Sequence, residues 1–243
     1  LVTTLLVTED IRFYDHSGID LKGLVRASYG VVKNIATLGS SGLEGGGSTI
    51  TQQLAKNLFK IRREKKGKLS GVPFLGLVIS KVKEWIVAVK LEEFYTKKEI
   101  LAMYLNTAEY GSNSYGIKVA AKTYFNKLPS ELNYNESSII VGLLNKPTKY
   151  NPYFNPDNAT EKRAEIFYNL YKYNVVDKET YDSLKVMDLS LNYKVENQNV
   201  GQATYFRTVV RNYLINWAKE NGYDLFSDGL KIHTTIDSRL QDH

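Results

Sequence analysis

The sequence lacks cysteine altogether, which excludes disulfide bonds and thiolate metal sites without assigning the protein to a compartment. It also lacks any apolar run long enough to span a bilayer, and it shows no signal-peptide pattern. No internal repeat or low-complexity segment occurs. The glycines at 45–47 do not continue into the Gly-x-x-x-x-Gly-Lys-Ser/Thr order of a P-loop, so nucleotide binding has little support.

Apolar residues make up 43% of the 243 residues, enough for one substantial core or for one large domain and the beginning of another. Their spacing predicts a mainly helical protein. The predicted helices are one beginning at Thr49 and those over residues 78–95, 97–107, 115–126, 136–145, 159–173, 177–186 and 202–221. Residues 189–195 and 230–236 alternate as strands do. We therefore place a domain boundary near 188, with a domain over 1–187 and a short α/β segment over 188–243.

The net charge of +6 and the pI of about 9.1 favour an anionic partner, such as phosphate groups, nucleic acid or a membrane surface. Residues 60–68 hold six basic side chains and one acidic one, and an apolar run follows at 71–79. This order is typical of a segment at a bilayer interface. A solvated loop before a buried helix is the alternative. Basic residues that cluster beside apolar ones, without interleaved aromatic residues, make nucleic acid the weaker option.

The stretch 8–18 places an acidic pair, aromatic residues, a histidine and a glycine directly after the apolar residues 1–7. Burial of that run would remove water from Glu9 and raise its pKa toward the range used in general acid or base catalysis. Glu9 is therefore the first candidate catalytic residue. The alternative is that Glu9 and Asp10 end a helix and face solvent.

The stretch 45–57 predicts a capped amphipathic helix, because Thr49 and Gln52 have the spacing of a capping box. Free backbone N–H groups at its start, the hydroxyls of Ser48 and Thr49, and Lys56 one turn on would suit an anion or a sugar phosphate. Without such a ligand it is an ordinary surface helix.

Lys81 and Glu84 lie three residues apart in a predicted helix that is apolar nearly all round. Buried charges need partners or a purpose. They are either part of a site or an ordinary ion pair.

These stretches and two later ones resemble the motifs of the glycosyltransferase domain of class A penicillin-binding proteins, the peptidoglycan glycosyltransferases of glycosyltransferase family 51. The matching patterns, in the family's order, are Glu9-Asp10-x-x-Phe13-x-x-His16-x-Gly18, Gly47-Ser48-Thr49-Ile50-Thr51-Gln52-Gln53-Leu54-x-Lys56-Asn57, Lys81-x-x-Glu84, Lys97-x-x-Ile100-Leu101-x-x-Tyr104-Leu105-Asn106 and Pro147-x-x-Tyr150-Asn151-Pro152. Residues 229–237 resemble the linker strand before the transpeptidase domain of two-domain members. Ser80 and Lys83 fit a Ser-x-x-Lys pattern, but no Lys-Thr-Gly accompanies them, so we treat the match as a coincidence.

The resemblance implies a mainly α-helical fold, with a lysozyme-like lobe beside a smaller membrane-associated lobe. It implies polymerisation of lipid II: the 4-hydroxyl of an acceptor sugar attacks the anomeric carbon of the donor and displaces polyprenyl pyrophosphate with inversion. The implied partners are lipid II, the growing glycan strand and a membrane surface, without nucleic acid. Other cell-wall synthesis and division proteins are further candidates. The implied location is the extracytoplasmic face of the bacterial cytoplasmic membrane, with an N-terminal anchor absent from this chain.

The resemblance also implies roles for individual residues. Glu9 would be the general base, and Glu84 would act at the leaving group, where it orients basic residues or a divalent cation, Mg or Mn; no cofactor is obligatory. Phosphate charge would be neutralised by Lys56 and Lys81. Sugar and phosphate oxygens would be held by Ser48, Thr49, Gln52 and Gln53, in a substrate site shaped by Asp10, Phe13 and His16.

Three departures from the family pattern bear on activity. Ser80 stands where the third motif usually has Arg, and Ala102 where the fourth usually has Glu. The stretch between Lys56 and Lys81 is also longer than expected. Loss of an Arg removes a bidentate phosphate clamp that Lys does not fully replace. Two alternatives to the transferase follow: a lysozyme-like glycan-cleaving enzyme, since Glu beside a sugar cleft also serves as a general acid, and a non-catalytic lipid II-binding scaffold.

Deletion of residues 61–76 tests whether the long stretch binds a membrane. We expect the shortened protein to lose binding in liposome flotation, because the deletion removes most of the basic run and part of the apolar one. Unchanged flotation would contradict this assignment.

Overall fold

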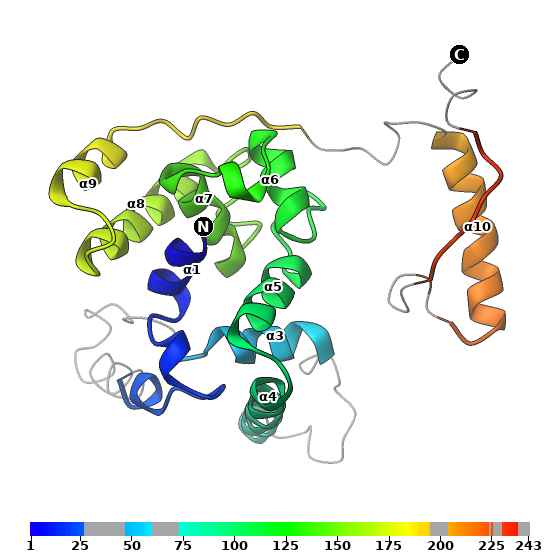
Figure 1. Cartoon of the computed structure of the whole chain (residues 1–243), viewed down its shortest axis with the longest axis horizontal. Coiled ribbons are helices and arrows are strands. Elements are labelled where there is room, and N and C mark those ends of the chain that lie inside the picture. Colours follow the sequence, from blue (N-terminus) through cyan, green and yellow to red (C-terminus); the bar gives the residue numbers. More distant parts are fainter. Residues whose placement is uncertain (27–46, 60–72, 195–203, 224, 226–229, 238–243) are drawn as a thin grey trace. The chain divides into compact units, whose positions relative to one another are not determined.

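The structure, a computed structural model, describes residues 1–26, 47–59, 73–194, 204–223, 225 and 230–237 (Figure 1). The chain divides into two compact units, Leu1–Val195 and Glu196–His243, each described by itself. The basic run at 60–68 lies outside the described residues, as do the side chains of 73–78. None of the described helices is long and apolar enough to cross a membrane.

Helices make up almost all the regular structure described, so the predicted mainly helical fold is confirmed. The first unit contains α1 (Val2–Glu9), η1 (Phe13–Asp15), α3 (Ile50–Phe59), α4 (Pro73–Phe94), α5 (Lys97–Thr107), α6 (Ile117–Phe125), η2 (Pro129–Glu131), α7 (Tyr134–Asn145), α8 (Pro156–Lys172) and α9 (Lys178–Lys185), and the second contains α10 (Thr204–Glu220).

Local sequence signals determine where several helices begin. The Thr96 hydroxyl accepts a bond from the Glu99 backbone N–H, and the Glu99 carboxylate accepts one from the Thr96 backbone N–H at 2.8 Å, which is a complete capping box. Asn133 and Glu136 form the same box at α7. Asp177 accepts from the Thr180 backbone N–H at 2.8 Å and caps α9.

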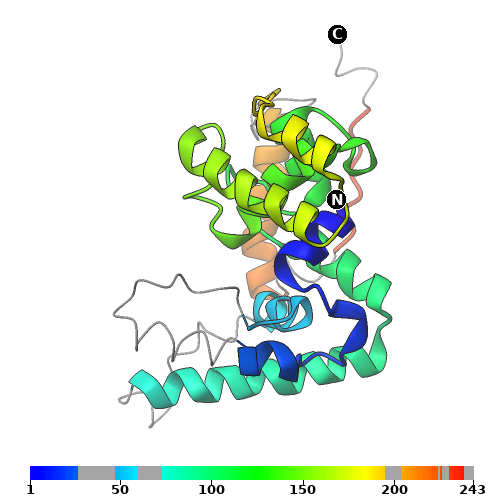
Figure 2. The ribbon, with the colours of Figure 1, turned by 90° about the vertical axis from the view of Figure 1, so that its left-hand side faces the viewer.

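The core of the first unit joins two groups of helices. α1 packs on α7 and α8, while α3 packs on α4 and α5. Figure 2 shows α4 as a long helix at one side of this unit, with α3 and residues 21–26 next to it. The side chains of Leu5, Ile50, Leu54 and Tyr104 are at most 2% exposed and belong to one apolar cluster. Burial of these side chains therefore fixes α1, α3 and α5 relative to one another.

The two predicted strands are wrong. Residues 189–194 and 230–236 form no strand in the part of the chain that the structure describes. Leu189, Leu191 and Tyr193 are half-buried against the core and alternate with exposed neighbours. The backbone N–H groups of Asn192 and Lys194 donate to the carbonyls of Tyr124 and Thr123 at 2.9 and 2.7 Å. The alternation therefore arises because one side of an extended segment packs on α6, not because it pairs in a sheet.

The division into compact units at 195 falls after this extended segment, which packs on the first unit. Asp188 is held there too, since its carbonyl accepts from Asn135 Nδ2 and Arg163 Nη1, each at 2.9 Å. A functional boundary at 187–188 stays a prediction.

Gly18 allows the chain after η1 to approach α4 closely. Its φ is +88°, and a Cβ at this position would lie 2.8 Å from both the carbonyl carbon and the oxygen of Ala88. Only glycine fits such a contact without moving the backbone. Gly18 thereby fixes the position of the first motif on the helix that carries the third.

The Gly18→Ala substitution tests this contact. We expect the free energy of unfolding to fall by about 1–3 kcal/mol, because the new methyl group meets backbone atoms and the φ is unfavourable. Urea unfolding followed by circular dichroism measures the change. Gly222→Ala is the control, since Gly222 has a φ of +76° with nothing within 4 Å of a built Cβ. Equal effects of the two substitutions on the main unfolding transition would contradict the role of the Ala88 contact.

Candidate active site

Glu9 ends α1 as a half-buried residue whose carboxylate faces α3. Its Oε2 accepts a hydrogen bond from Gln53 Nε2 at 2.8 Å. Burial raises the pKa of Glu9 above that of an ordinary glutamate, and nearby Glu165 and Asp10 raise it further, whereas the Gln53 bond and nearby Lys162 lower it. A raised pKa suits a carboxyl group that takes part in general acid or base catalysis.

Glu9 lines a cavity of about 330 Å³. The walls come from the end of α1, from residues 20–26, from Gly47 and Ser48, and from the C-terminal half of α8. The full set of lining residues is Val7, Thr8, Glu9, Asp10, Ile11, Asp20, Gly23, Arg26, Gly47, Ser48, Glu165, Tyr168, Asn169, Lys172 and Tyr173. The structure therefore brings three predicted site residues, Glu9, Asp10 and Ser48, to one cavity. The α8 wall was not predicted, because no motif includes it.

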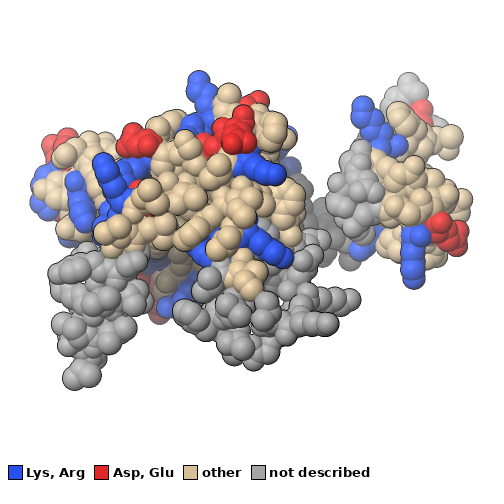
Figure 3. Space-filling model, turned by 90° about the horizontal axis from the view of Figure 1, so that it is seen from below, with Lys and Arg blue, Asp and Glu red and all other residues tan. Residues whose placement is uncertain are grey.

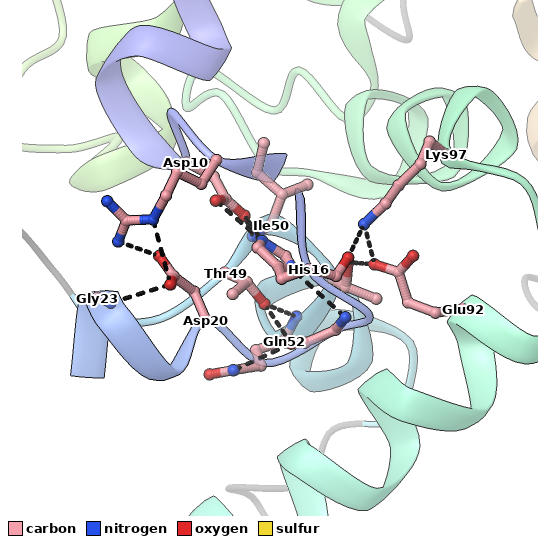
Figure 4. Close-up of polar contacts among 12 residues, drawn as sticks. Asp10, His16, Asp20, Gly23, Thr49, Ile50, Gln52, Glu92 and Lys97 are labelled. Carbon is pink, nitrogen blue, oxygen red and sulfur yellow. Dashed lines mark hydrogen bonds and ion pairs between the residues drawn. The ribbon is translucent and has the colours of Figure 1, made fainter. Parts of the chain in front are cut away.

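Asp10 joins the first motif to the start of α3 (Figure 4). It is 7% exposed; His16 Nε2 lies 3.1 Å from both of its carboxylate oxygens, and the Ile50 backbone N–H donates to Oδ2 at 3.0 Å. The Gly18 N–H donates to His16 Nδ1 at 3.2 Å, so the ring proton is on Nε2, which donates to Asp10. A carboxylate at a helix N-terminus also interacts favourably with the helix dipole.

The predicted cap at Thr49 is confirmed in part. Its Oγ1 accepts from the Gln52 backbone N–H at 3.2 Å and donates to the Gly18 carbonyl at 2.7 Å. The Gln52 side chain does not complete the box: its Nε2 donates to the Gly18 carbonyl at 3.1 Å, and its Oε1 accepts no hydrogen bond within the described residues. The helix start was predicted to offer free N–H groups to an anion; those of Ile50 and Gln52 are instead used by Asp10 and Thr49.

Lys81 connects α4 with Ser48, two residues before the start of α3. Its Nζ donates to Ser48 Oγ at 2.8 Å and to Glu84 Oε2 at 2.9 Å. Glu84 is 2% exposed. The pair is therefore an i,i+3 ion pair and also a contact with Ser48, which lines the cavity. Lys81 keeps some exposure, 26% of its side chain, so its charge is within reach of a ligand at Ser48.

The residues around Glu84 give little support to a metal site. Among the described residues, no group of three or more His, Asp or Glu side chains is placed to hold a metal ion. The Glu84 carboxylate instead pairs with Lys81. No catalytic step is assigned to a cation here, and the predicted Mg or Mn stays a prediction.

Lys97 and Glu92 were not predicted as site residues, although the fourth motif contains Lys97. Lys97 Nζ donates to the His16 carbonyl at 2.6 Å and to Glu92 Oε1 at 2.8 Å (Figure 4). It also lies 4.3 Å from the centroid of the Phe13 ring. Thr51 Oγ1 donates to the same Glu92 oxygen at 2.6 Å. Phe13 is fully buried in the apolar core and thus anchors the first motif there. A lysine at the start of the fourth motif is the only sequence signal for this contact.

Some predicted features lie apart from this cluster. Lys56 is exposed on α3, and none of its hydrogen bonds or ion pairs within the described residues joins it to the other site residues. Ala102 is exposed on α5, so the departure from Glu at that position removes no buried contact; Ser80 is half-buried on α4. On the face in Figure 3, Lys and Arg occur at several separate places and alternate with Asp and Glu.

Known proteins match this chain over nearly all of its length. Residues 1–171 match the transglycosylase family. Penicillin-binding protein 1A of Aquifex aeolicus is 34% identical over 241 residues, 99% of this chain and 30% of that protein. Penicillin-binding protein 1A of Haemophilus influenzae is 35% identical over 242 residues, 99% of this chain and 26% of that protein. A crystal structure of penicillin-binding protein 1A from Haemophilus influenzae is 33% identical to this chain. The structural match covers 60% of this chain and 21% of the crystallised chain, with a TM-score of 0.42.

The chain belongs to the transglycosylase family, the peptidoglycan glycosyltransferase domains of penicillin-binding proteins, as its motifs predicted. The predicted enzyme class is thereby confirmed. The chain spans 30% or less of the length of these two penicillin-binding proteins 1A.

The Lys97→Met substitution tests whether Lys97 supports the first motif. We expect a loss of about 2–4 kcal/mol in the free energy of unfolding, because the Glu92 side chain, 6% exposed, would lose its ion-pair partner. Urea denaturation measures the loss. Lys178→Met is the control: the Lys178 and Asp182 side chains are 61% and 51% exposed, so breaking that pair should have little effect. Similar losses in the two variants would refute the supporting role.

Proposed function

We propose that this chain polymerises lipid II into peptidoglycan glycan strands by inverting glycosyl transfer, with polyprenyl pyrophosphate as the leaving group. The observation that carries the proposal is the position of Glu9: a half-buried carboxylate in the wall of a polar cavity, held by Gln53, with its pKa raised by burial. Membership of the transglycosylase family supports the reaction class.

Glu9 acts as the general base in this proposal. The acceptor's 4-hydroxyl donates its proton to the carboxylate as the oxygen attacks the anomeric carbon of the donor, and the bond to the pyrophosphate oxygen breaks on the opposite face of the sugar. A carboxylate whose pKa is raised toward the working pH accepts the proton more readily than an ordinary glutamate, provided that it is still ionised. The Gln53 bond keeps the carboxylate oriented.

The departing pyrophosphate needs positive charge and hydrogen-bond donors. Lys81 and the Ser48 hydroxyl, which are in contact with each other, supply them beside the cavity in this proposal. Glu84 holds the Lys81 ammonium group in this position, so that its role is to orient a cation. Asp10 and His16 fix the backbone around Glu9 through their contacts with α3 and Gly18.

Exposed apolar side chains support a location at a membrane surface. Ile86 of α4 and Phe59 of α3 are 54% and 57% exposed, and Leu21 and Val25 nearby are 72% and 71% exposed. These elements lie at the same side of the first unit (Figure 2). Large apolar side chains gathered on one side of a protein mark interaction surfaces. We infer that this side faces the lipid that carries the substrate, at the extracytoplasmic face of the bacterial cytoplasmic membrane.

The Glu9→Gln substitution tests the assignment of the base. We expect polymer formation from purified lipid II to fall by about 10²–10⁴-fold, because the amide cannot accept the proton. Glu161→Gln, the same change at an exposed position of α8, serves as the control and should retain activity. Polymer of native yield from the Glu9 variant would refute the role of Glu9, and release of fragments from preformed glycan would identify a lysozyme-like hydrolase. If native protein and both variants all leave lipid II unconverted, the result would favour a binding scaffold.

The pH dependence of polymerisation provides a second test. A general base works only when it is deprotonated, so kcat/KM should fall as the pH decreases through the pKa of Glu9. Since burial raises that pKa, the fall should begin at a higher pH than for an ordinary glutamate. Initial rates measured across the mildly acidic range, with stability monitored in parallel, locate this limb. A rate that is constant down to the pKa of an exposed carboxylate would contradict the assignment.

A further inference from the structure

A chain of two hydrogen bonds runs from Glu9 into the core. Glu9 Oε2 accepts from Gln53 Nε2 at 2.8 Å, and Gln53 Oε1 accepts from the Tyr104 hydroxyl at 2.8 Å. Tyr104 is 2% exposed and belongs to α5, so the chain crosses from α1 through α3 to α5. Within the described residues, Gln53 is the sole hydrogen-bond partner of the Tyr104 hydroxyl. The fourth motif contains Tyr104, but no catalytic contact was predicted for it.

The Gln53 side chain could in principle face Glu9 with either end. Its NH₂ group only donates, and its carbonyl oxygen only accepts. A glutamine that is free to rotate could present the oxygen to a protonated Glu9 as readily as the NH₂ group to an ionised one. The Tyr104 hydroxyl, which contacts the end of the Gln53 amide that is remote from Glu9, therefore decides which orientation of the amide is favoured.

Tyr104 is a reliable donor because it stays protonated. Burial, followed by the nearby negative charge of Glu9, raises the pKa of Tyr104 well above that of an ordinary tyrosine. Its O–H therefore needs an acceptor, and the Gln53 carbonyl is the one within reach. If the amide turned around, the buried hydroxyl would lose this acceptor, at a cost typical of an unsatisfied buried polar group.

We propose that Tyr104 is a positioning residue for the catalytic base: its buried hydroxyl fixes the orientation of the Gln53 amide, so that the NH₂ group, rather than the carbonyl oxygen, faces Glu9. This inference rests on the proposed role of Glu9. Hydrogen bonds from a donor stabilise a carboxylate more than a carboxylic acid. The arrangement thus favours the ionised form of Glu9, whereas burial favours the protonated form.

Other charged groups also face Glu9 and must stay unchanged in a test. Asp10 is its neighbour in sequence, and Lys162 and Glu165 approach from α8, where their side chains form an ion pair. Lys162 favours the ionised form of Glu9, whereas Glu165 and Asp10 oppose it. None of them contacts Tyr104 through a described hydrogen bond, so a substitution of Tyr104 leaves these influences in place.

The Tyr104→Phe substitution removes the hydroxyl and keeps the ring. We expect kcat/KM for lipid II polymerisation to fall by about twofold to tenfold at mildly acidic pH, the effect of losing one hydrogen bond, and to approach the native value at alkaline pH. The acidic limb of the profile should move to higher pH. Tyr110→Phe is the matched control: Tyr110 is fully buried and donates to the Leu105 carbonyl at 3.1 Å, without contact to Gln53, so its pH profile should coincide with that of the native protein.

A second variant keeps the test decisive if Tyr104→Phe is poorly folded. Gln53→Leu removes both hydrogen bonds and should shift the pH profile in the same direction. Adding Tyr104→Phe to Gln53→Leu should then cause no further shift, because Tyr104 acts through Gln53. A further shift in the double variant, or a loss that is equal at every pH in Tyr104→Phe, would overturn the proposal.

A titration that does not depend on turnover separates this inference from the proposed function. In protein labelled with ¹³C-glutamate, the Glu9 carboxyl signal, assigned by its absence in Glu9→Gln, should titrate at higher pH in Tyr104→Phe than in native protein. An unchanged titration would overturn the positioning role even if Glu9 is the base. If Glu9→Gln retains full polymerisation, the proposed role of Glu9 as the general base fails, whereas a raised titration in Tyr104→Phe would still support the fixed orientation of Gln53.

Discussion

The buried carboxylate of Asp10 is the interaction on which the rest of the site depends. It binds the His16 ring and the first amide of α3 at once, and it thereby joins two segments that are 40 residues apart in sequence. A charge this deeply buried is tolerated only because several donors surround it. With Asp10 fixed, Glu9 immediately before it can lie against Gln53. Both carboxylates line the cavity, but Asp10 binds the backbone of α3, whereas Glu9 binds the Gln53 side chain.

The same pattern extends across the site. Gly18 presents its carbonyl to Thr49 and Gln52 and presses against α4, while Lys97 ties the His16 carbonyl to Glu92. These motif residues therefore contact each other rather than the cavity. Mutual hydrogen bonding occupies these side chains, whereas Glu9 and Ser48 line the cavity and Lys81 contacts Ser48.

Sequence patterns predicted the helices well, because helix boundaries depend on neighbouring residues. The predicted helix at 97–107 coincides with α5, and its limit is fixed by the Thr96 capping box. The predicted strands at 189–195 and 230–236 were wrong. Alternation of apolar and polar residues indicates which side chains are buried, but it does not indicate whether a sheet or a helix covers them. Leu191 and Tyr193 are covered by a helical surface, which no local pattern distinguishes from a sheet.

The site was predicted through its motifs, and what could not be predicted is which contacts each motif residue makes. Lys81 and Glu84 were expected to be either a site or an ion pair, and they are in contact as a pair that also touches Ser48. The backbone N–H groups at the start of α3 were expected to be free. One of them, that of Ile50, instead donates to Asp10, a carboxylate 40 residues away in sequence. The wall formed by Tyr168 and Lys172 belongs to no motif, and only the packing of α1 on α8 brings it to Glu9.

The extended segment at 189–194 has a consequence for where the folding unit ends. Tyr193 stacks on Tyr153 at 4.1 Å between ring centroids and donates to Ser112, while its neighbours use the last carbonyls of α6. A protein cut directly after the last motif would uncover this aromatic stack and leave those carbonyls to water. The shortest chain that keeps these contacts must therefore extend to residue 194, well beyond the last motif at 147–152.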